Sequence, residues 1–228
     1  LATIKKAIHD GRVLLSDGAW GTTLQDMGLR AEECPDIWCL NHRQEVKEVA
    51  ENYVAAGADI IKCNSFGANR YKLRHYDIED AAQAINETAA GISREAAGTQ
   101  RWVAAPVGPT GVQLALRDVS ESALYDAFAE QVVALAKGGA DAILVESMSS
   151  LDEADLAIRA AMQNTDCEVL CTLPFAATIQ NEYRTLAGRL PQEVIPPMLE
   201  SGVNVIGTNC ANVFESMVPI VAILRSLA

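Results

Sequence analysis

The sequence lacks any stretch of about 20 apolar residues, so we expect no helix that spans a membrane. An apolar signal core is missing too, because the first ten residues form an amphipathic, lysine-bearing segment, and secretion is not indicated. Basic residues are few: 18 Lys and Arg stand against 30 Asp and Glu, a formal net charge of -12. No basic patch interrupts that charge, which repels polyanions, and we therefore expect no nucleic-acid partner.

Close cysteine pairs are also lacking. The six cysteines are widely spaced, with no C-x-x-C pair, at Cys34, Cys39, Cys63, Cys167, Cys171 and Cys210. A disulfide scaffold is shorter and denser in cysteine, and zinc ribbons and thioredoxin-type sites need the close pair. We therefore expect reduced thiols and a cytoplasmic location. The nucleotide-binding signatures G-x-G-x-x-G and G-x-x-x-x-G-K-[ST] are absent as well.

The composition is that of a globular protein with a sizeable core. Half of the 228 residues are hydrophobic and the mean hydropathy is +0.09, which fits a single domain over residues 1–228. Short, continuously apolar runs recur along the chain, as is typical of buried parallel strands. The predicted strands are 13–17, 59–63, 102–106, 142–146, 168–173 and 203–210.

Helical patterns lie between these strands. Val46, Val49 and Tyr53 share one helical face, and a capping box at 150–153 begins another helix. Three turns repeat one pattern, in which Gly, a small apolar residue and Asp or Asn precede a strand: AGADII at 56–61, GGADAI at 138–143 and SGVNVI at 201–206. Such a Gly suits the left-handed cap of a helix. Strict alternation predicts a parallel sheet, either doubly wound or closed as a barrel.

Polar residues at the strand ends favour the barrel. They are Asp17, Asn64, Glu146, Asn209 and Cys210. In a barrel these ends meet at one mouth, whereas in an open sheet the ends far from the switch point share no site. We therefore predict an α/β fold, a (β/α)₈ TIM barrel with only about six β/α units present. Eight units need roughly 290–300 residues, so we expect a domain truncated at its C-terminus, with the protein continuing past Ala228.

Three of these residues are candidates for chemistry, each with a structural alternative. Asp17, followed by a glycine loop, can hold an ammonium group or only cap that loop. Glu146 follows four apolar strand residues, so it either binds a ligand or forms an ion pair at the barrel rim. Cys210 is a lone cysteine, a residue type that is more often a small buried hydrophobe. Lys62 lies within its predicted strand and is unsuited to a Schiff base.

Five segments in this order closely resemble the homocysteine S-methyltransferase domain. That family includes the domain of cobalamin-dependent methionine synthase and betaine–homocysteine methyltransferase. The segments are SDGAWGTT at 16–23, DIIKCNSFGANRYKL at 59–73, VGPTG at 107–111, VES at 145–147 and GTNC at 207–210. The resemblance covers the chain from about residue 11 to its end. It implies a (β/α)₈ barrel that transfers a methyl group to the thiol of homocysteine, giving methionine.

The resemblance also implies roles for individual residues. The family holds one zinc ion with three cysteines at the barrel mouth, and Cys210 matches the first of these ligands. The implied substrate-binding positions are Asp17, Gly18, Ala19, Asn64, Glu146 and Asn209. Zinc lowers the pKa of a bound thiol and so provides a thiolate that attacks an activated methyl group.

The sequence departs from the family at the other two zinc ligands. These are an adjacent Cys-Cys pair, and the chain contains no such pair. Because one cysteine cannot hold a catalytic zinc ion, either the chain is truncated and the remaining ligands lie outside this sequence, which we favour, or the domain binds ligand without catalysis. Zinc-dependent methyl transfer to homocysteine, or to a similar thiol, is the leading hypothesis. The donor is open among methylcobalamin on a corrinoid protein or domain, a methylfolate, a betaine and a sulfonium.

Two other functions remain open. One is a non-catalytic module that binds a thiol or a corrinoid protein and lacks a complete zinc site. The other is an unrelated barrel lyase or aldolase that uses Asp17 and Glu146 as acid and base.

Overall fold

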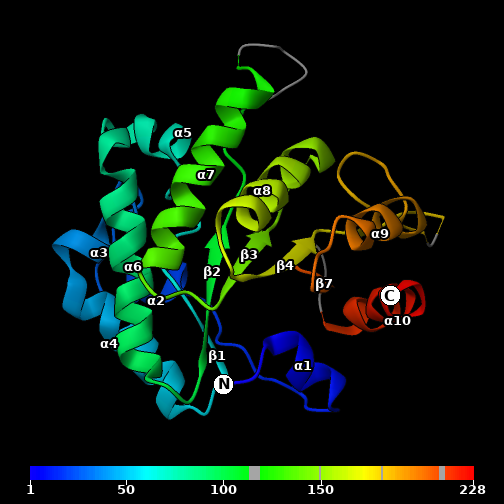
Figure 1. Ribbon diagram of the computed structural model, residues 1–228, viewed down its shortest axis with the longest axis horizontal. Coiled ribbons are helices and arrows are strands. Elements are labelled where there is room, and N and C mark those ends of the chain that lie inside the picture. Colours follow the sequence, from blue (N-terminus) through cyan, green and yellow to red (C-terminus); the bar gives the residue numbers. More distant parts are fainter. Residues whose placement is uncertain (113–118, 149, 181, 211–213) are drawn as a thin grey trace.

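The computed structural model describes residues 1–112, 119–148, 150–180, 182–210 and 214–228. Its centre is a parallel five-stranded sheet in the order β1-β2-β3-β4-β7 (Figure 1). The strands are β1 (Ile60–Lys62), β2 (Trp102–Val107), β3 (Ala142–Glu146), β4 (Glu168–Leu173) and β7 (Val205–Thr208). Neighbouring strands follow each other along the chain without the reversal that marks a doubly wound sheet. The predicted α/β fold is confirmed, and the sheet is part of a (β/α)₈ barrel.

Helices alternate with these strands. They are α1 (Ile4–His9), α2 (Gly21–Asp26), α3 (Trp38–Asn41), α4 (Arg43–Ala55), α5 (Arg70–Leu73), α6 (Ala82–Ala97), α7 (Glu121–Lys137), α8 (Leu151–Asn164), α9 (Pro191–Glu200) and α10 (Phe214–Leu227). Of these, α4, α6, α7 and α8 cover the outer face of the sheet (Figure 1). Two 3₁₀ turns, η1 (Arg74–Tyr76) and η2 (Glu79–Ala81), precede α6. None of the helices in the described ranges combines the length and apolarity needed to cross a bilayer.

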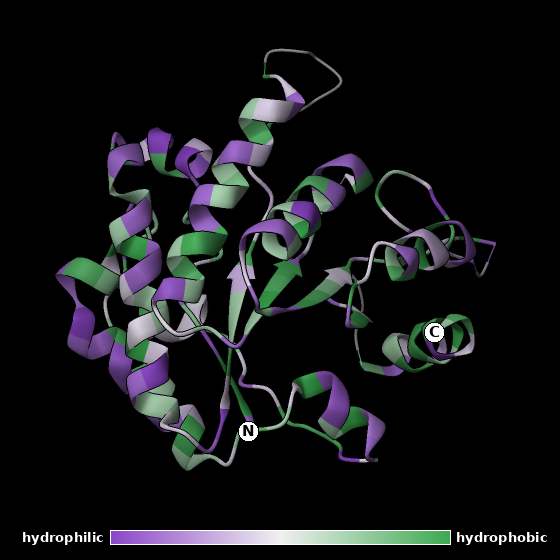
Figure 2. Cartoon of the chain, viewed as in Figure 1, coloured by the Kyte–Doolittle hydropathy of each residue, from purple (hydrophilic) through white to green (hydrophobic). Residues whose placement is uncertain are grey.

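Successive strand residues point to opposite faces of the sheet and enter two different clusters. Ile61, Val103 and Ile143 pack outward in the large cluster beneath the helices. The residues that alternate with them pack inward in a second, smaller cluster. Both faces of β3 are therefore apolar, and the strand is green in Figure 2. The predicted continuous apolar runs thus correspond to strands buried on both sides.

Helix α1 fills the inner face of the sheet. Its fully buried Ile4 packs with Ile60, Trp102 and Leu170, and burying a side chain of this size contributes about 1.5–3 kcal/mol. The carboxylate of Glu168, the first residue of β4, accepts hydrogen bonds from the backbone N–H groups of Ile4 and of the residue after it. The amphipathic segment at residues 1–10 is therefore a plug for the barrel interior.

The three predicted helix-to-strand turns adopt the expected backbone. Gly57, Gly139 and Gly202 have φ angles of 95°, 105° and 91°, in the left-handed region that glycine tolerates. Each allows the chain to leave its helix and enter the next strand within a few residues.

The Asp or Asn of each turn ties its strand to the preceding one. Asp59 accepts from the Leu15 N–H at 3.0 Å, Asp141 accepts from the Val103 N–H at 2.7 Å, and Asn204 accepts from the Val169 N–H at 2.8 Å. In the other direction, the backbone N–H of each of these residues donates to the carbonyl of the same partner. The repeated pattern in the sequence is therefore a two-bond clamp between neighbouring strands.

One predicted strand needs correction. The segment 13–17 is not a full strand: it meets β1 through one bridge, Ser16 to Ile60. The described residues pair it on one side only, and Val13 and Leu15 are 96% and 61% exposed, so burial of apolar side chains does not hold the segment in the sheet. A short hairpin of β5 (Ala176–Ala177) and β6 (Tyr183–Arg184) follows β4.

The capping box at the start of α8 is only half formed. Ser150 caps the helix, since its hydroxyl accepts from the Glu153 N–H. The buried Glu153 carboxylate instead accepts from the backbone N–H and the hydroxyl of Thr110, at 2.8 and 2.5 Å. The carboxylate thus anchors the loop after β2, which a local capping rule does not foresee.

Replacing Asp141 by Ala should destabilise the protein by about 2–3 kcal/mol, because a charged acceptor is removed from both the Val103 N–H and the Arg94 guanidinium. Urea unfolding measures this change. The exposed Asp166, in the turn before β4, serves as the control, and Asp166→Ala should stay within about 0.5 kcal/mol of the unaltered protein. Equal losses in the two variants would contradict the clamp.

Candidate active site

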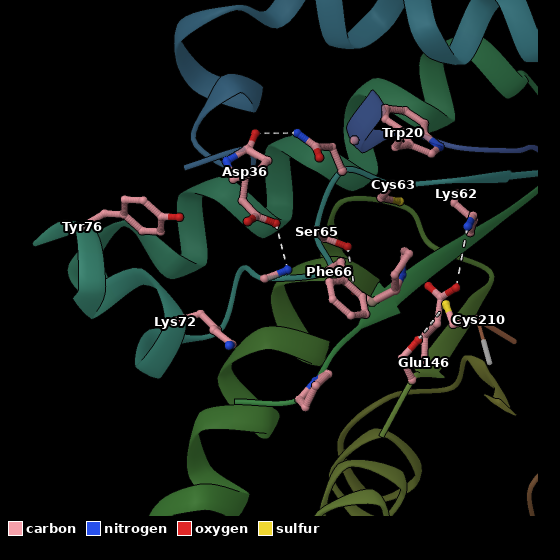
Figure 3. A pocket seen from close by; sticks show the side chains of 17 residues that line it. Trp20, Asp36, Lys62, Cys63, Ser65, Phe66, Lys72, Tyr76, Glu146 and Cys210 are labelled. Atoms are coloured by element: carbon pink, nitrogen blue, oxygen red, sulfur yellow. Dashed lines mark hydrogen bonds and ion pairs between the residues drawn. The ribbon is translucent and has the colours of Figure 1, made fainter. Parts of the chain in front are cut away.

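The carboxyl ends of β1, β3 and β7 bring Lys62, Glu146 and Cys210 to one rim of the sheet. A cavity of about 450 Å³ opens at this rim. Figure 3 shows the three side chains on one side of the cavity, with Lys72 and Tyr76 on the opposite side. The prediction that the strand ends converge is therefore confirmed for Glu146 and Cys210, which come from segments 64 positions apart.

Asp17 lies next to this group but is occupied by its own neighbours. One carboxylate oxygen accepts from the Trp20 indole N–H at 2.8 Å and from the Lys62 backbone N–H at 2.6 Å. Burial raises the pKa of Asp17, and these two hydrogen bonds act in the opposite direction. Trp20 and Lys62 line the cavity. Asp17 therefore shapes the site through residues that reach it.

The glycine loop after Asp17 is packed closely against Tyr53. The Tyr53 hydroxyl donates to the Ala19 carbonyl at 2.8 Å. A Cβ on Gly18 would lie 2.9 Å from the same hydroxyl oxygen, which is too close for ordinary contact. Glycine at this position thus allows the close approach of Tyr53 from α4.

Glu146 and Lys62 face each other across the rim. The Lys62 Nζ lies 3.8 Å from a Glu146 Oε, and the two side chains are 21% and 18% exposed. This ion pair is the structural alternative foreseen for Glu146. Lys62 was overlooked as a site residue, although its place as the last residue of β1 puts it on the same rim as the strand ends that were identified.

Asn64 lines the cavity but is committed to holding a loop. It is buried, and its Nδ2 donates to the Pro35 carbonyl at 2.7 Å. The Cys39 thiol donates to the Asn64 carbonyl at 3.3 Å. Asn64 thereby fixes the segment carrying Asp36, which forms another part of the cavity wall.

Cys210, Asn209 and Ser147 form a compact polar group. The Asn209 Nδ2 donates to the Ser147 Oγ at 2.5 Å and to the Cys210 Sγ at 3.2 Å. Among the residues the structure describes, three other than glycine have positive φ, and two of them are Ser147 at 60° and Cys210 at 63°. Such backbone strain, of order 1–3 kcal/mol for each residue, gathers at functional sites.

Cys210 is the exposed thiol of the six. Burial raises the pKa of the others, to about 11 at Cys34, to about 12 at Cys63 and Cys171, and upward at Cys39 and Cys167. These five are held as neutral thiols at neutral pH. Among the described residues, Cys210 is therefore the cysteine whose sulfur is accessible for a reaction.

Residues 14–228 match the profile of the homocysteine S-methyltransferase family. The chain belongs to this family. Methionine synthases of Mycobacterium tuberculosis and Mycobacterium leprae are 30% and 28% identical to it, each over 88% of this chain. The metallated form of the homocysteine methyltransferase MmuM from Escherichia coli superimposes with a TM-score of 0.80 at 21% identity. That alignment covers 98% of this chain and 83% of MmuM, and it supports the fold.

The chain spans 18% of the length of the two methionine synthases. Membership in the homocysteine S-methyltransferase family confirms the resemblance noted from the sequence motifs. The activity, substrates and partners of the whole protein are matters for proposal.

The zinc ion implied by the family is not accommodated by the described residues alone. They include no group of three or more His, Cys, Asp and Glu side chains placed to hold a metal ion. Cys210 is exposed at the mouth and has Asn209 and Ser147, not further thiols, as its neighbours. One thiolate falls short of the three protein ligands that catalytic zinc sites use.

The far wall of the cavity contains a buried carboxyl group that the sequence did not single out. Asp36 is 6% exposed, and one of its oxygens accepts from the Gly67 N–H at 3.0 Å. Burial raises its pKa to about 6. No periodicity or strand end marks this position, because it lies in a loop whose burial depends on the strand and helix packed around it.

The raised pKa of Asp36 predicts a measurable pH dependence. Its pKa rises from 3.8 to about 6 on folding, so the folded state binds the proton more tightly and stability falls as pH rises between these values. The stability of Asp36→Asn relative to the unaltered protein should therefore increase by up to about 3 kcal/mol from pH 4 to pH 7. Urea unfolding at several pH values tests this. Asp166→Asn, at an exposed site, is the matched control, and a flat difference for Asp36→Asn would refute the raised pKa.

Proposed function

We propose that this chain is the homocysteine-binding part of an S-methyltransferase that transfers a methyl group to the homocysteine thiol and forms methionine. The observation that carries the proposal is the family match over residues 14–228 on a chain whose strand ends place Glu146 and Cys210 in one cavity. In the reaction, the sulfur loses its proton and forms a bond to the methyl carbon, while the bond from that carbon to the donor breaks.

We assign the amino-acid end of homocysteine to the rim beside β1 and β3. Glu146 faces the cavity and is not hydrogen-bonded to any described side chain, so it is suited to hold the ammonium group. Asp17 supports this wall through Trp20 and Lys62, and Gly18 and Ala19 form the loop between Asp17 and Trp20. Asn64 and Asn209 complete the rim by holding the neighbouring loop and the Cys210 sulfur.

We further propose that the complete protein depends on zinc and that Cys210 is one of the ligands. The supporting observation is that Cys210 combines exposure with a position at the mouth. The other ligands then lie outside residues 1–228. The methyl donor remains to be assigned, with methylcobalamin on a corrinoid protein or domain as one option, and the reduced thiols suit the cytoplasm.

Methionine formation tests the main proposal. The complete protein is incubated with homocysteine and, in turn, methylcobalamin, a methylfolate, a betaine and a methylsulfonium donor, and methionine is measured by mass spectrometry. Steady production with one donor supports the transferase. Binding of homocysteine without turnover with any donor would favour the alternative, a non-catalytic thiol- or corrinoid-protein-binding module.

Cys210→Ser should remove both bound zinc and methyl transfer in the complete protein, because a hydroxyl is a poor replacement for a thiolate ligand. We expect at least a tenfold loss of each, measured by elemental analysis and by methionine formation. Cys167→Ser is the matched control, since this half-buried thiol contacts the Ala140 carbonyl before β3, at the end opposite the mouth. Unchanged zinc content and activity in Cys210→Ser would refute the ligand assignment.

Glu146→Gln should raise the KM for homocysteine by about tenfold and lower kcat by much less, because Glu146 holds the substrate and takes no part in bond making. Steady-state kinetics over a range of homocysteine concentrations separates the two constants. A fall in kcat with an unchanged KM would instead assign Glu146 to the chemical step.

A further inference from the structure

Lys62 and Glu146 form an ion pair that leaves most of their hydrogen-bonding capacity unused. At 3.8 Å, the Nζ–Oε separation is longer than the 2.7–2.9 Å of a charge-assisted hydrogen bond. Among the described residues, neither the Lys62 ammonium nor the Glu146 carboxylate makes a hydrogen bond to any other group, and both line the cavity. Burying a charged group to about four-fifths costs free energy of desolvation unless an ion-pair or hydrogen-bond partner offsets that cost.

The two charges match a ligand that carries one charge of each sign close together. An α-amino acid has its ammonium and carboxylate groups on the same carbon, Cα, so its two binding partners must lie close together. Lys62 supplies three donors and Glu146 supplies carboxylate acceptors, 3.8 Å apart on one wall. Cys210 opens into the same cavity, next to Glu146, where the side-chain thiol of such a ligand would lie (Figure 3).

The backbone of Lys62 is held on both sides, which fixes where its side chain begins. Its N–H donates to Asp17 at 2.6 Å, and its carbonyl accepts from the Ser93 hydroxyl at 2.8 Å. The half-buried Asp17 thus fixes the strand end that carries the ammonium group. This arrangement explains why the Asp17 carboxylate lies so close to the cavity although it does not line the cavity.

We propose that Lys62 binds the α-carboxylate of the amino-acid substrate while Glu146 binds its ammonium group. Lys62 is then a specificity-determining residue that distinguishes an amino-acid thiol from a simple aminothiol. This assignment rests on the proposed homocysteine-binding function. Lys72 also lines the cavity, but Figure 3 shows it on the opposite side from Glu146 and Cys210.

Binding of three related thiols to the complete protein tests the proposal. The ligands are homocysteine, 3-aminopropane-1-thiol, which lacks the carboxylate, and 4-sulfanylbutanoate, which lacks the amine. Titration calorimetry should show that Lys62→Met weakens homocysteine binding by about 10- to 100-fold. The same variant should bind 3-aminopropane-1-thiol as tightly as the unaltered protein, or more tightly, because the Lys62 ammonium no longer competes for Glu146. This retained binding also shows that the variant site is folded.

Two further variants sharpen the result. Lys62→Arg keeps a cation and should bind homocysteine within a few-fold of the unaltered protein. Lys137→Met removes a different lysine from an ion pair, with Glu87 at 2.8 Å on the surface of α7, and should leave all three affinities unchanged. Glu146→Gln should weaken 3-aminopropane-1-thiol and leave 4-sulfanylbutanoate nearly unaffected.

The opposite outcomes separate the two proposals. If the unaltered protein binds homocysteine but Lys62→Met weakens homocysteine and 3-aminopropane-1-thiol equally, or weakens neither, the assignment of Lys62 is wrong and the proposed function stands. A loss of homocysteine affinity in Lys72→Met but not in Lys62→Met would likewise overturn it. If the unaltered protein does not bind homocysteine at all, the proposed function itself fails, and this inference fails with it.

Discussion

The register of the parallel sheet depends on a side-chain clamp that is repeated between neighbouring strands. Asp59, Asp141 and Asn204 each accept a hydrogen bond from the preceding strand and donate one back. A slip by one residue would turn every side chain to the other face. Because these clamps lie at the amino ends of the strands, they set where the carboxyl ends finish. The meeting of Lys62, Glu146 and Cys210 at the mouth therefore depends on residues at the other end of the sheet.

Much of the fold was predictable, since its signals are local. A continuous apolar run and a Gly followed by Asp or Asn each identify an element within a few residues, and the bounds of β3 and β4 were predicted as they are found. The segment at residues 13–17 was predicted wrongly because its burial depends on strands on both sides of it, and the described residues supply only β1. The Glu153 carboxylate was placed in a capping box, yet it bonds Thr110, 43 positions away, which no local rule can anticipate.

The site was predictable to the extent that it lies on strand ends. Glu146 and Cys210 were identified in this way, and the cavity joins them. Lys62 and Asp36 were not, for different reasons: Lys62 was considered only as a Schiff-base lysine, and Asp36 lies in a loop whose place is set by the Asn64 side chain. The binding role of Asp17 stays a prediction. Its carboxylate satisfies the Trp20 and Lys62 N–H groups, so its contribution to any ligand passes through those residues.

Under the proposed function, recognition of the amino-acid end and activation of the sulfur are physically separate tasks. The charged pair of Lys62 and Glu146 and the cavity beside it lie wholly within the described residues, whereas those residues contain no group of three or more His, Cys, Asp and Glu side chains placed to hold a metal ion. Electrostatic pairing with a zwitterion requires no metal, because each charge of the ligand meets its opposite directly. Affinity for the amino-acid end can therefore exist before a metal site is completed. In the proposed binding mode, placing the substrate by its charged end brings its thiol towards Cys210, because Lys62, Glu146 and Cys210 line one cavity. The rim that would select the substrate would thereby also set where the sulfur chemistry takes place.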